Sequence, residues 1–403
     1  MRHSVLILLF LFSTNSISFA QDSVRLMTYN ILNYPYVAAS RADTLAIIID
    51  AVLPDILIVN ELQNNTGANA ILNNAMNSSG RTNYSKAIFY NGGDSDNMCY
   101  YDNNKFGLFS QNQIATSIRD ISEYVLFWKG NLPSADTIYF NVYSVHLKAS
   151  SGASNEAQRL AEAQILKARI DNRSGINNIF VGGDFNIYDA SEPAYQEIIT
   201  GGITDLFDPI NSAGSWHVNA AYAAIHTQAT GSINGGSGGG LDDRFDFFFV
   251  SSDIINGTNS VQYIDGTYKA YGQDGNRFNS DLNVWPSNTV VSAQIASALY
   301  NMSDHLPVIM DVVVDPTLDI EGTANSIPKL FHAEKSKEIV FSSATPKERV
   351  QIEVIDLLGK RLKQKTFGNA STLRLKIDEL KTGIYLASAK SDNVCYSIKF
   401  IIR

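Results

Sequence analysis

The segment N-M-S-D-H-L-P-V-I-M, residues 301–310, places a charged pair directly before an apolar run. Asp304 and His305 stand at the start of a stretch that stays apolar almost without interruption to residue 314. Such a run predicts a buried strand. An isolated carboxylate in an apolar surrounding is costly unless it is paired or bound to a metal ion. The segment therefore predicts a strand that brings an acid and an imidazole to a shared polar site.

Apolar strands that alternate with helices run through the first 315 residues. Apolar runs predict strands at residues 24–32, 55–62, 137–147, 177–185, 244–252 and 306–314, and periodic apolar residues predict helices at 42–53 and 154–171. We expect the second helix to bury the face that carries Ala157, Leu160, Ala161, Ile165 and Ala168. This alternation indicates an α/β domain.

Polar residues end these strands or stand alone within them. They are Asn30, Glu61, His146, Asp184, Asn186, Asp246, Asp304 and His305. Because buried strands tolerate unpaired charge poorly, we expect these side chains to converge. Oxygen-rich clusters suit hard cations such as Mg²⁺, which takes one or two carboxylates together with water and substrate phosphate. Neighbouring histidines transfer protons near neutral pH, so the set predicts metal-assisted hydrolysis of a phosphoester.

Charge divides the chain into two parts. Residues 321–403 contain fifteen Lys and Arg against nine Asp and Glu, a net charge of +6, which leaves −15 for residues 1–320. So acidic a region argues against tight, nonspecific binding of duplex nucleic acid, although divalent cations can offset part of the repulsion. The chain has two cysteines, Cys99 and Cys395, so it lacks a disulfide framework. We expect the two cysteines in different domains and not bonded to each other.

Residues 1–20 have the features of a secretory signal. They combine a basic start, an apolar run from Val5 to Phe12 and small residues at Ser18 and Ala20. The apolar run is shorter than the roughly 18 residues that a membrane span requires. We therefore expect cleavage after Ala20 and export of the remaining chain.

Six short motifs in a fixed order resemble those of the endonuclease/exonuclease/phosphatase superfamily, which includes DNase I, abasic-site endonucleases, neutral sphingomyelinases and inositol polyphosphate phosphatases. They are T-Y-N-I, N-E-L-Q, S-V-H-L-K, G-G-D-F-N, R-F-D-F-F-F-V-S and S-D-H-L-P-V, and the resemblance covers residues 24–314. It implies a four-layered α/β sandwich in which two mainly antiparallel or mixed sheets pack face to face between helices. It also implies a site at one edge of the sheets.

The resemblance implies a role for each motif residue. Glu61 would be the main metal carboxylate, with Asn30 beside it and Asp304 as a further ligand. Asp184 and Asn186 would position the attacking water and the phosphoryl oxygens. The implied cofactor is Mg²⁺, with Mn²⁺ or Ca²⁺ as alternatives.

The two motif histidines have separate implied roles. His305 would lie against the scissile phosphate as base or electrostatic stabiliser, and His146 would act as the acid, as in the DNase I branch. The segment D-D-R-F-D-F-F-F-V, residues 242–250, fits two family variants. The carboxylate that orients His305 is therefore Asp246 or Asp243, and we favour Asp246 because the apolar run follows it directly.

Four further residues are candidates for substrate binding. Lys148 follows the motif histidine by two residues, and Arg159 could contact phosphate or be a solvated surface residue. His217 and His226 lie in the loop region before R-F-D and could bind substrate or only cap that loop, and the same two alternatives hold for Trp216 and Gln228 in this region. The glycine-rich residues 231–240 lack the lysine and the strand-to-helix setting of a phosphate-binding loop, so we expect a flexible loop beside the site.

The character of the sequence changes after residue 315. Short β-like runs with V-I-D-L-L-G-K-R-L, L-K-T-G-I-Y-L and a basic end resemble the C-terminal sorting domain of the type IX secretion system of certain Gram-negative bacteria, without its usual opening Asn-Pro element. A carbohydrate-binding or adhesion-type β-sandwich is the alternative. We expect a signal peptide at 1–20, a catalytic domain at 21–315, a linker at 316–328 and a small β-sandwich sorting domain at 329–403.

These features predict a secreted or surface-located, divalent-metal-dependent phosphodiesterase. We expect a nuclease, because export and the second histidine fit the release of nutrients from extracellular nucleic acid. A phosphoesterase that acts on phospholipid head groups or small phosphorylated molecules is the alternative, since the net charge of −15 weakens the nuclease prediction. A non-catalytic surface protein is a third class. We expect a monomer whose substrate is nucleic acid and whose partner is the type IX secretion machinery.

Overall fold

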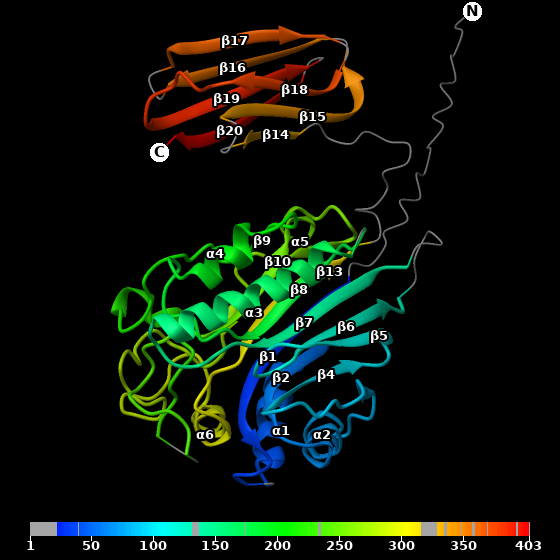
Figure 1. The fold of residues 1–403 in the computed structure, drawn as a ribbon, viewed down its shortest axis with the longest axis vertical. Helices are drawn as coiled ribbons and strands as arrows, with labels where there is room; N and C mark the ends of the chain where they lie inside the picture. Colours follow the sequence, from blue (N-terminus) through cyan, green and yellow to red (C-terminus); the bar gives the residue numbers. More distant parts are fainter. Residues whose placement is uncertain are drawn as a thin grey trace, which may run out of the picture. The chain divides into compact units, whose positions relative to one another are not determined.

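The structure is a computed structural model, and it divides the chain into two compact units, Met1–Asp319 and Ile320–Arg403. Figure 1 colours the first unit from blue to yellow and the second from orange to red. The predicted signal peptide at 1–20 and the predicted linker at 316–328 lie outside the described residues. The structure describes residues 22–38, 40–130, 137–173, 175–232, 235–315, 329–333, 337–347, 349–356, 359–368, 370–391 and 394–402.

The first sheet of the first unit is built around a parallel pair of strands. Its described strands lie in the order β11 (Val261–Tyr263), β13 (Val308–Val314), β1 (Asp22–Tyr34), β2 (Ile56–Leu62), β4 (Asp96–Asp102) and β3 (Tyr84–Lys86), with β12 (Lys269–Ala270) paired to β13. β1 and β2 run parallel, and α1 (Arg41–Val52) connects them. The other strand pairs are antiparallel.

The second sheet has a similar plan. Its described strands lie in the order β5 (Phe106–Ile114), β6 (Ile121–Trp128), β7 (Tyr139–His146), β8 (Ile179–Asp184), β10 (Asp246–Ser251) and β9 (Leu206–Phe207). β7 and β8 are parallel, and α3 (Ala153–Asp171) connects them. The parallel strands of both sheets carry motif residues at their carboxyl ends.

Helices cover the outer faces of both sheets, as Figure 1 shows. The first sheet is covered by α1, α2 (Asn65–Ile71), the π-helical turn η1 (Leu72–Met76) and α6 (Ala293–Met302), and the second by α3 and α4 (Pro193–Thr200). The shorter η2 (Ala220–Ile225) and α5 (Ser252–Asn256) lie in the connections. The predicted four-layered α/β sandwich is therefore confirmed.

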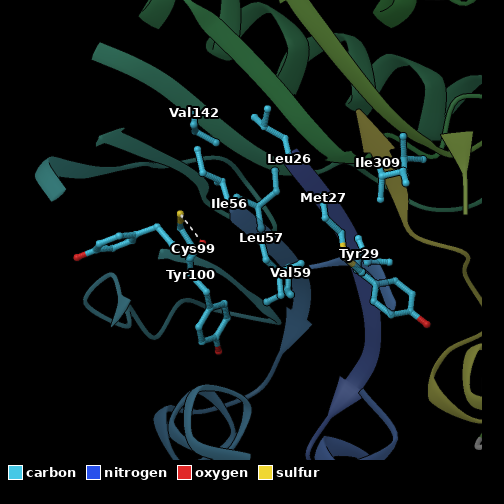
Figure 2. Packing of buried hydrophobic residues seen from close by; sticks show 14 of the residues in the cluster. Leu26, Met27, Tyr29, Ile56, Leu57, Val59, Cys99, Tyr100, Val142 and Ile309 are labelled. Atoms are coloured by element: carbon cyan, nitrogen blue, oxygen red, sulfur yellow. Dashed lines mark hydrogen bonds between the residues drawn. The ribbon is translucent and has the colours of Figure 1, made fainter. Parts of the chain in front are cut away.

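The inner faces of the two sheets pack against each other. In Figure 2, Leu26 of β1 and Ile56 of β2 point toward Val142 of β7. All three side chains are almost completely buried, and burial of apolar side chains is the main favourable contribution to folding. Cys99 of β4 is a free, buried cysteine in the same cluster.

A glycine on β8 lets the two sheets approach closely. A Cβ atom at Gly182 would lie 2.8 Å from Cδ1 of Ile58 on β2 and 2.5 Å from Cε1 of Phe248 on β10. Both distances are shorter than real contacts of a Cβ atom allow. The position, two residues before Asp184 on the same strand, therefore requires a residue without a side chain.

The predicted strands and helices are confirmed, but the predicted buried face of the second helix is wrong. The helix α3 buries Arg159, Glu162, Ala163, Leu166 and Ile170 rather than the face with Leu160 and Ile165. Charged residues can lie on this buried face because they are paired within the protein. The strands β3 to β6, β9, β11 and β12 and the helices α2, α4 and α6 were not predicted.

The second unit consists of antiparallel strands. One sheet has the order β14 (Lys329–Ala333), β15 (Glu338–Lys347) and β18 (Ala370–Lys376), and the other the order β17 (Arg361–Phe367), β16 (Val350–Asp356), β19 (Gly383–Ser391) and β20 (Val394–Ile402). Alternating apolar residues of both sheets, such as Ile339 and Ile352, share one buried cluster. Across both units, no helix in the described ranges is long and apolar enough to cross a membrane.

Candidate active site

Strand ends from both sheets bring four polar side chains together. Asn30 at the bend of β1 donates through Nδ2 to Glu61 Oε1 and to Asp184 Oδ2, both at 3.0 Å. His146 pairs with Asp184 in the register of β7 and β8. Its Nε2 lies 3.6 Å from Asp184 Oδ2 and 3.9 Å from Glu61 Oε1. The predicted convergence of Asn30, Glu61, His146 and Asp184 is present in the structure.

His305 reaches the same cluster from the segment before β13. Its Nδ1 lies 2.7 Å from Asp246 Oδ2, and its Nε2 lies 3.7 Å from Asp184 Oδ2. Asp246 is held beside Asp184 by the pairing of β10 with β8. Asp243 contacts His217 instead, with Asp243 Oδ1 2.6 Å from His217 Nδ1. Of the two carboxylates left open by the sequence, Asp246 is the one that contacts His305.

The carboxylate of Asp304 is directed toward the glycine-rich loop. Its Oδ2 accepts from the backbone N–H of Ser237 at 2.7 Å and from Gln228 Nε2 at 3.3 Å. A Cβ atom at Gly236 would lie 2.7 Å from the Asp304 carboxyl carbon, so this loop packs directly on the aspartate. The loop therefore lies beside the site, and the metal-ligand role of Asp304 stays a prediction.

Gln228, one of the unusual residues in the loop region before R-F-D, lies in the site. Its side-chain amide lies 2.6 Å from His305 Nε2 and also contacts Asp304. The backbone of the same residue pairs with Asp243 and His305 through isolated β-bridges. Because Gln228 belongs to a loop without an apolar period, its only signal in the sequence is its place among unusual polar residues before R-F-D.

The two imidazoles of the site have opposite electrostatic environments. Burial lowers the pKa of His146 well below its usual value, and Arg119 and His305 lower it further. Burial also acts to lower the pKa of His305, but the nearby Asp246 and Asp184 carboxylates outweigh it and raise that pKa well above the usual value. Burial raises the pKa of Asp184 to about 7. The site thus favours a neutral His146 beside a protonated His305.

Left-handed backbone conformations occur at both sides of the cluster. Glu61 has a φ of 62° and Asn186 a φ of 51°, and Leu32 and Asn33 follow Asn30 with φ values of 45° and 46°. Such residues cost on the order of 1–3 kcal/mol each unless the surrounding structure imposes them, and they gather at functional sites. Here the bend brings the backbone N–H of Asn33 within 2.9 Å of Glu61 Oε2.

Asn186 extends the second half of the site. Its backbone N–H donates to Asp184 Oδ1 at 3.0 Å, and its Nδ2 donates to the carbonyl of Leu147 at 3.2 Å. The side chain is buried beside the end of β7. Asn186 therefore fixes the Asp184 carboxylate and ties the ends of the two parallel strands together.

The cluster fits a hard divalent cation that keeps part of its water shell better than a metal ion held by several protein ligands. In the ranges that the structure describes, no group of three or more His, Cys, Asp or Glu side chains forms a metal site. Mg²⁺ needs only one or two carboxylates, because water and substrate phosphate complete its shell. Glu61 supplies such a carboxylate, since 18% of its side chain is exposed whereas 2% of Asp184 is. The residues present therefore fit Mg²⁺ at Glu61.

Two of the four residues predicted to bind substrate, Arg159 and His226, are buried in the structure. Arg159 is fully buried, donates to Glu192 Oε2 at 2.9 Å and also binds the carbonyls of Lys148 and Ser150. His226 is also fully buried, with its ring nitrogens 2.8 Å and 3.3 Å from the backbone carbonyls of Trp216 and Leu241. Both side chains hold loops in place, because their polar atoms are directed into the protein.

The other two candidates lie at the rim of the site. Lys148 is half-buried and follows the strand end at His146, and its Nζ donates to the carbonyl of Ala149 at 2.8 Å. The side chain of His217 is 46% exposed and is oriented by Asp243. The ring of Tyr188, two residues after Asn186, packs edge-on against His217 with centroids 5.0 Å apart. Lys148 and His217 remain accessible to a substrate.

Comparison with known proteins agrees with this geometry. The chain matches the Endonuclease/Exonuclease/phosphatase family over residues 27–305 and the secretion system C-terminal sorting domain over residues 335–403. The second match is the type IX sorting domain, which indicates secretion and attachment to the cell surface. No curated protein matches the sequence.

Solved structures of similar fold come from animals and bacteria. D. rerio TDP2 in complex with a single-strand DNA product is 14% identical, covers 72% of this chain and 98% of its own, and has a TM-score of 0.49. The human nocturnin catalytic domain is 16% identical, with 72% and 97% covered and a TM-score of 0.43. A family protein from Bacteroides thetaiotaomicron is 14% identical, with 74% and 100% covered and a TM-score of 0.45.

Members of the matched family are phosphoesterase hydrolases that generally depend on divalent metal ions. The match spans more than half of the chain and includes the strand ends that carry Asn30, Glu61, His146, Asp184 and His305. With its motifs, its four-layered fold and its clustered site residues, the chain belongs to the endonuclease/exonuclease/phosphatase family.

Proposed function

We propose that this protein is a secreted, Mg²⁺-dependent phosphodiesterase that hydrolyses nucleic acid. The observation that carries the proposal is the contact between His305 and Asp246. Nδ1 of His305 lies 2.7 Å from Asp246 Oδ2, and Nε2, the other ring nitrogen, faces Asp184, Asn30 and Gln228. A protonated imidazole in this position provides a fixed positive charge for a phosphoryl group. The carboxylates next to it would bind the cation and position the attacking water.

The residues of the first sheet would hold the metal ion. Glu61 would bind it, with Asn30 fixing the carboxylate by its hydrogen bond at 3.0 Å. When bound, Mg²⁺ would neutralise charge on the phosphate and polarise a phosphoryl oxygen. Asn33 donates its backbone N–H to the other oxygen of Glu61, so the carboxylate has one fixed orientation.

The residues of the second sheet would handle the water. Asp184 lies between Asn30 and His146, and Asn186 fixes its second oxygen. A carboxylate with a pKa near 7 is matched to proton transfer at neutral pH. We assign the water-positioning role to Asp184 and Asn186, and the stabilisation of the phosphoryl charge to His305.

We propose for His146 a role other than the acid that the resemblance implies. An acid must carry a proton to donate, and burial favours the neutral form of this imidazole. Its Nδ1 has no hydrogen-bond partner among the residues described, while its Nε2 faces the carboxylates. We propose that His146 orients the substrate or receives a proton rather than beginning the reaction as the acid.

Phospholipid head groups are the second candidate substrate, and the net charge of −15 on residues 1–320 favours it over duplex nucleic acid. A substrate panel distinguishes the two candidates. Purified protein is incubated with DNA, RNA, sphingomyelin and phosphoinositides in Mg²⁺, Mn²⁺, Ca²⁺ or a chelator. We expect cleavage of nucleic acid in Mg²⁺ and its loss on chelation. Hydrolysis of lipid with no cleavage of DNA or RNA would overturn the proposal.

A further inference from the structure

The loop before α6 presents a tryptophan to solvent. Trp285 is 89% exposed, the highest value among the large hydrophobic side chains that the structure describes. Tryptophan is usually well buried, and where it is exposed in soluble proteins it is enriched at binding surfaces. No part of the catalytic cluster uses this side chain.

A buried arginine, Arg277, holds the loop that carries Trp285. Arg277 is fully buried and donates through Nη1 to the carbonyl of Val284 at 2.7 Å and through Nη2 to the carbonyl of Pro286 at 2.6 Å. Its Nη2 also lies 3.2 Å from Asp274 Oδ2. One guanidinium therefore fixes the carbonyls on both sides of Trp285. The indole projects from a fixed backbone, so little conformational freedom would be lost on binding.

Hydrogen bonds connect this loop to the active site. The backbone N–H of Leu282 donates to the carbonyl of Thr230 at 2.7 Å, and the N–H of Thr230 donates to the carbonyl of Asp304 at 2.9 Å. The hydroxyl of Thr230 donates to the carbonyl of Ser303 at 2.6 Å. Leu282, three residues before Trp285, is thus connected through Thr230 to the backbone of Asp304, the neighbour of His305.

The chemistry around Trp285 suits a nucleobase. Residues 282–303 contain no charged side chain, and the preceding Asp281 is half-buried, so this segment adds little repulsion of a phosphate chain and no cation that would attract an anionic membrane. Exposed Asn283, Ser287 and Thr289 flank the indole and can form hydrogen bonds with base edges, whereas insertion into lipid would bury them. Stacking is tolerant of sequence because every base has an aromatic face.

From these observations we propose that Trp285 stacks on an unpaired base of the substrate strand outside the scissile phosphate, which makes single-stranded nucleic acid the preferred substrate. This inference rests on the proposed function. A base inside a duplex has both faces covered by its neighbours, so the indole distinguishes a single strand from a duplex. The stacking also supplies attraction that the acidic domain cannot obtain from charge.

The test compares the full chain with Trp285→Ala, Trp285→Phe and Trp285→Leu. Phe109→Ala is the control, because Phe109 on β5 is another aromatic side chain with 65% exposure. Cleavage of single-stranded and duplex oligonucleotides is measured in Mg²⁺, with bis(p-nitrophenyl) phosphate as a substrate without a base. Binding of a fluorescent oligothymidylate is measured in a chelator, and binding to phosphatidylcholine vesicles is measured by sedimentation.

We expect Trp285→Ala to raise the KM for a single strand and the Kd for oligothymidylate by roughly 5- to 150-fold, the range for one stacked base. Turnover of bis(p-nitrophenyl) phosphate and cleavage of duplex should be unchanged. Trp285→Phe should retain most of the affinity, Trp285→Leu should behave like Trp285→Ala, and Phe109→Ala should resemble the unmodified protein.

Three results would overturn the inference. They are an unchanged Kd in Trp285→Ala, full affinity in Trp285→Leu, and vesicle binding that depends on Trp285 without oligonucleotide binding. The proposed function is tested separately by cleavage. If all variants cleave nucleic acid equally, the function stands and the stacking role fails. If no form cleaves nucleic acid but oligothymidylate binding still requires Trp285, the stacking role stands and the proposed function fails.

Discussion

The two units of this chain treat charged residues in opposite ways. In the first unit, Arg159, Arg244 and Arg277 are completely buried, as are several carboxylates. In the second unit, every charged side chain for which the structure describes burial is exposed or half-buried, and the buried positions are apolar apart from the half-polar Tyr385. In the residues whose burial is described, the small β-sandwich that serves for sorting contains no buried charge, whereas the first unit places charge inside at a cost in solvation.

Within the first unit, charge balance separates structural residues from site residues. The fully buried Arg159, Arg244 and Arg277 each pair with one carboxylate. The two terminal nitrogens of Arg244, for example, lie 2.8 Å and 2.9 Å from Asp208. In the site, Asp246 and Asp184 lie beside His305, and Glu61 shares Asn30 with Asp184, without an equal number of cations. An excess of buried carboxylates is what a bound divalent cation would compensate.

Glu61→Gln should have the largest effect, because it removes the carboxylate that the proposed cation requires. We expect turnover to fall at least about 100-fold, since even residues behind the direct ligands of a metal ion typically contribute 10- to 100-fold. Calorimetric titration with Mg²⁺ should show weakened binding, and thermal unfolding in a chelator should be little changed. Activity that survives both this substitution and chelation would contradict the metal mechanism.

Asp246→Asn compared with Asp243→Asn should give the next largest difference. Asp246 accepts the hydrogen bond that orients His305, so its loss should lower kcat about 100-fold, the lower range for a positioned acid or base. Asp243 holds His217 at the rim, so Asp243→Asn should change KM more than kcat. Steady-state kinetics of both variants provide the measurement. The reverse ranking would assign the orienting role to Asp243.

Arg159→Met should affect stability more than catalysis, because this arginine is a structural residue. Removing one partner of a buried pair leaves Glu192 uncompensated, and the free energy of unfolding should fall by about 3–5 kcal/mol. Denaturant titration measures this change. The double variant Arg159→Met, Glu192→Leu is the matched control and should recover part of the loss. A large rise in KM at unchanged stability would restore Arg159 as a substrate-binding residue.

A chain of residues 21–318 should show the smallest effect on catalysis. The side chains of the site cluster described above all belong to the first unit, so we expect the shortened chain to hydrolyse its substrate as well as the full chain does. In the native host we expect the shortened chain to accumulate in the periplasm, because it lacks the sorting domain. Cell fractionation and activity assays test both outcomes. A shortened chain that is secreted but inactive would show that the tail is part of the enzyme.

The sequence was most informative where a continuous apolar run predicts a strand and a polar residue ends it. That pattern located Glu61 and Asp184 because strand register then places such residues at one edge. The buried face of α3 could not be predicted, since its charged residues are buried only through pairing with residues distant in the chain. Gln228 and Trp285 lie in loops, and their positions depend on long-range hydrogen bonds that leave no period in the sequence.

The lack of a side chain at Gly182 limits which substitutions the core of this protein can accept. Glu61 and Asp184 belong to different sheets, so the spacing of the two sheets sets the distance between these two carboxylates. A single methyl group at Gly182 would meet Ile58 and Phe248 and act as a wedge between the two halves. A displacement of about 1 Å can cost on the order of 100-fold in rate. A substitution at Gly182 in the hydrophobic core would therefore be expected to lower the rate of catalysis, although this position touches no substrate.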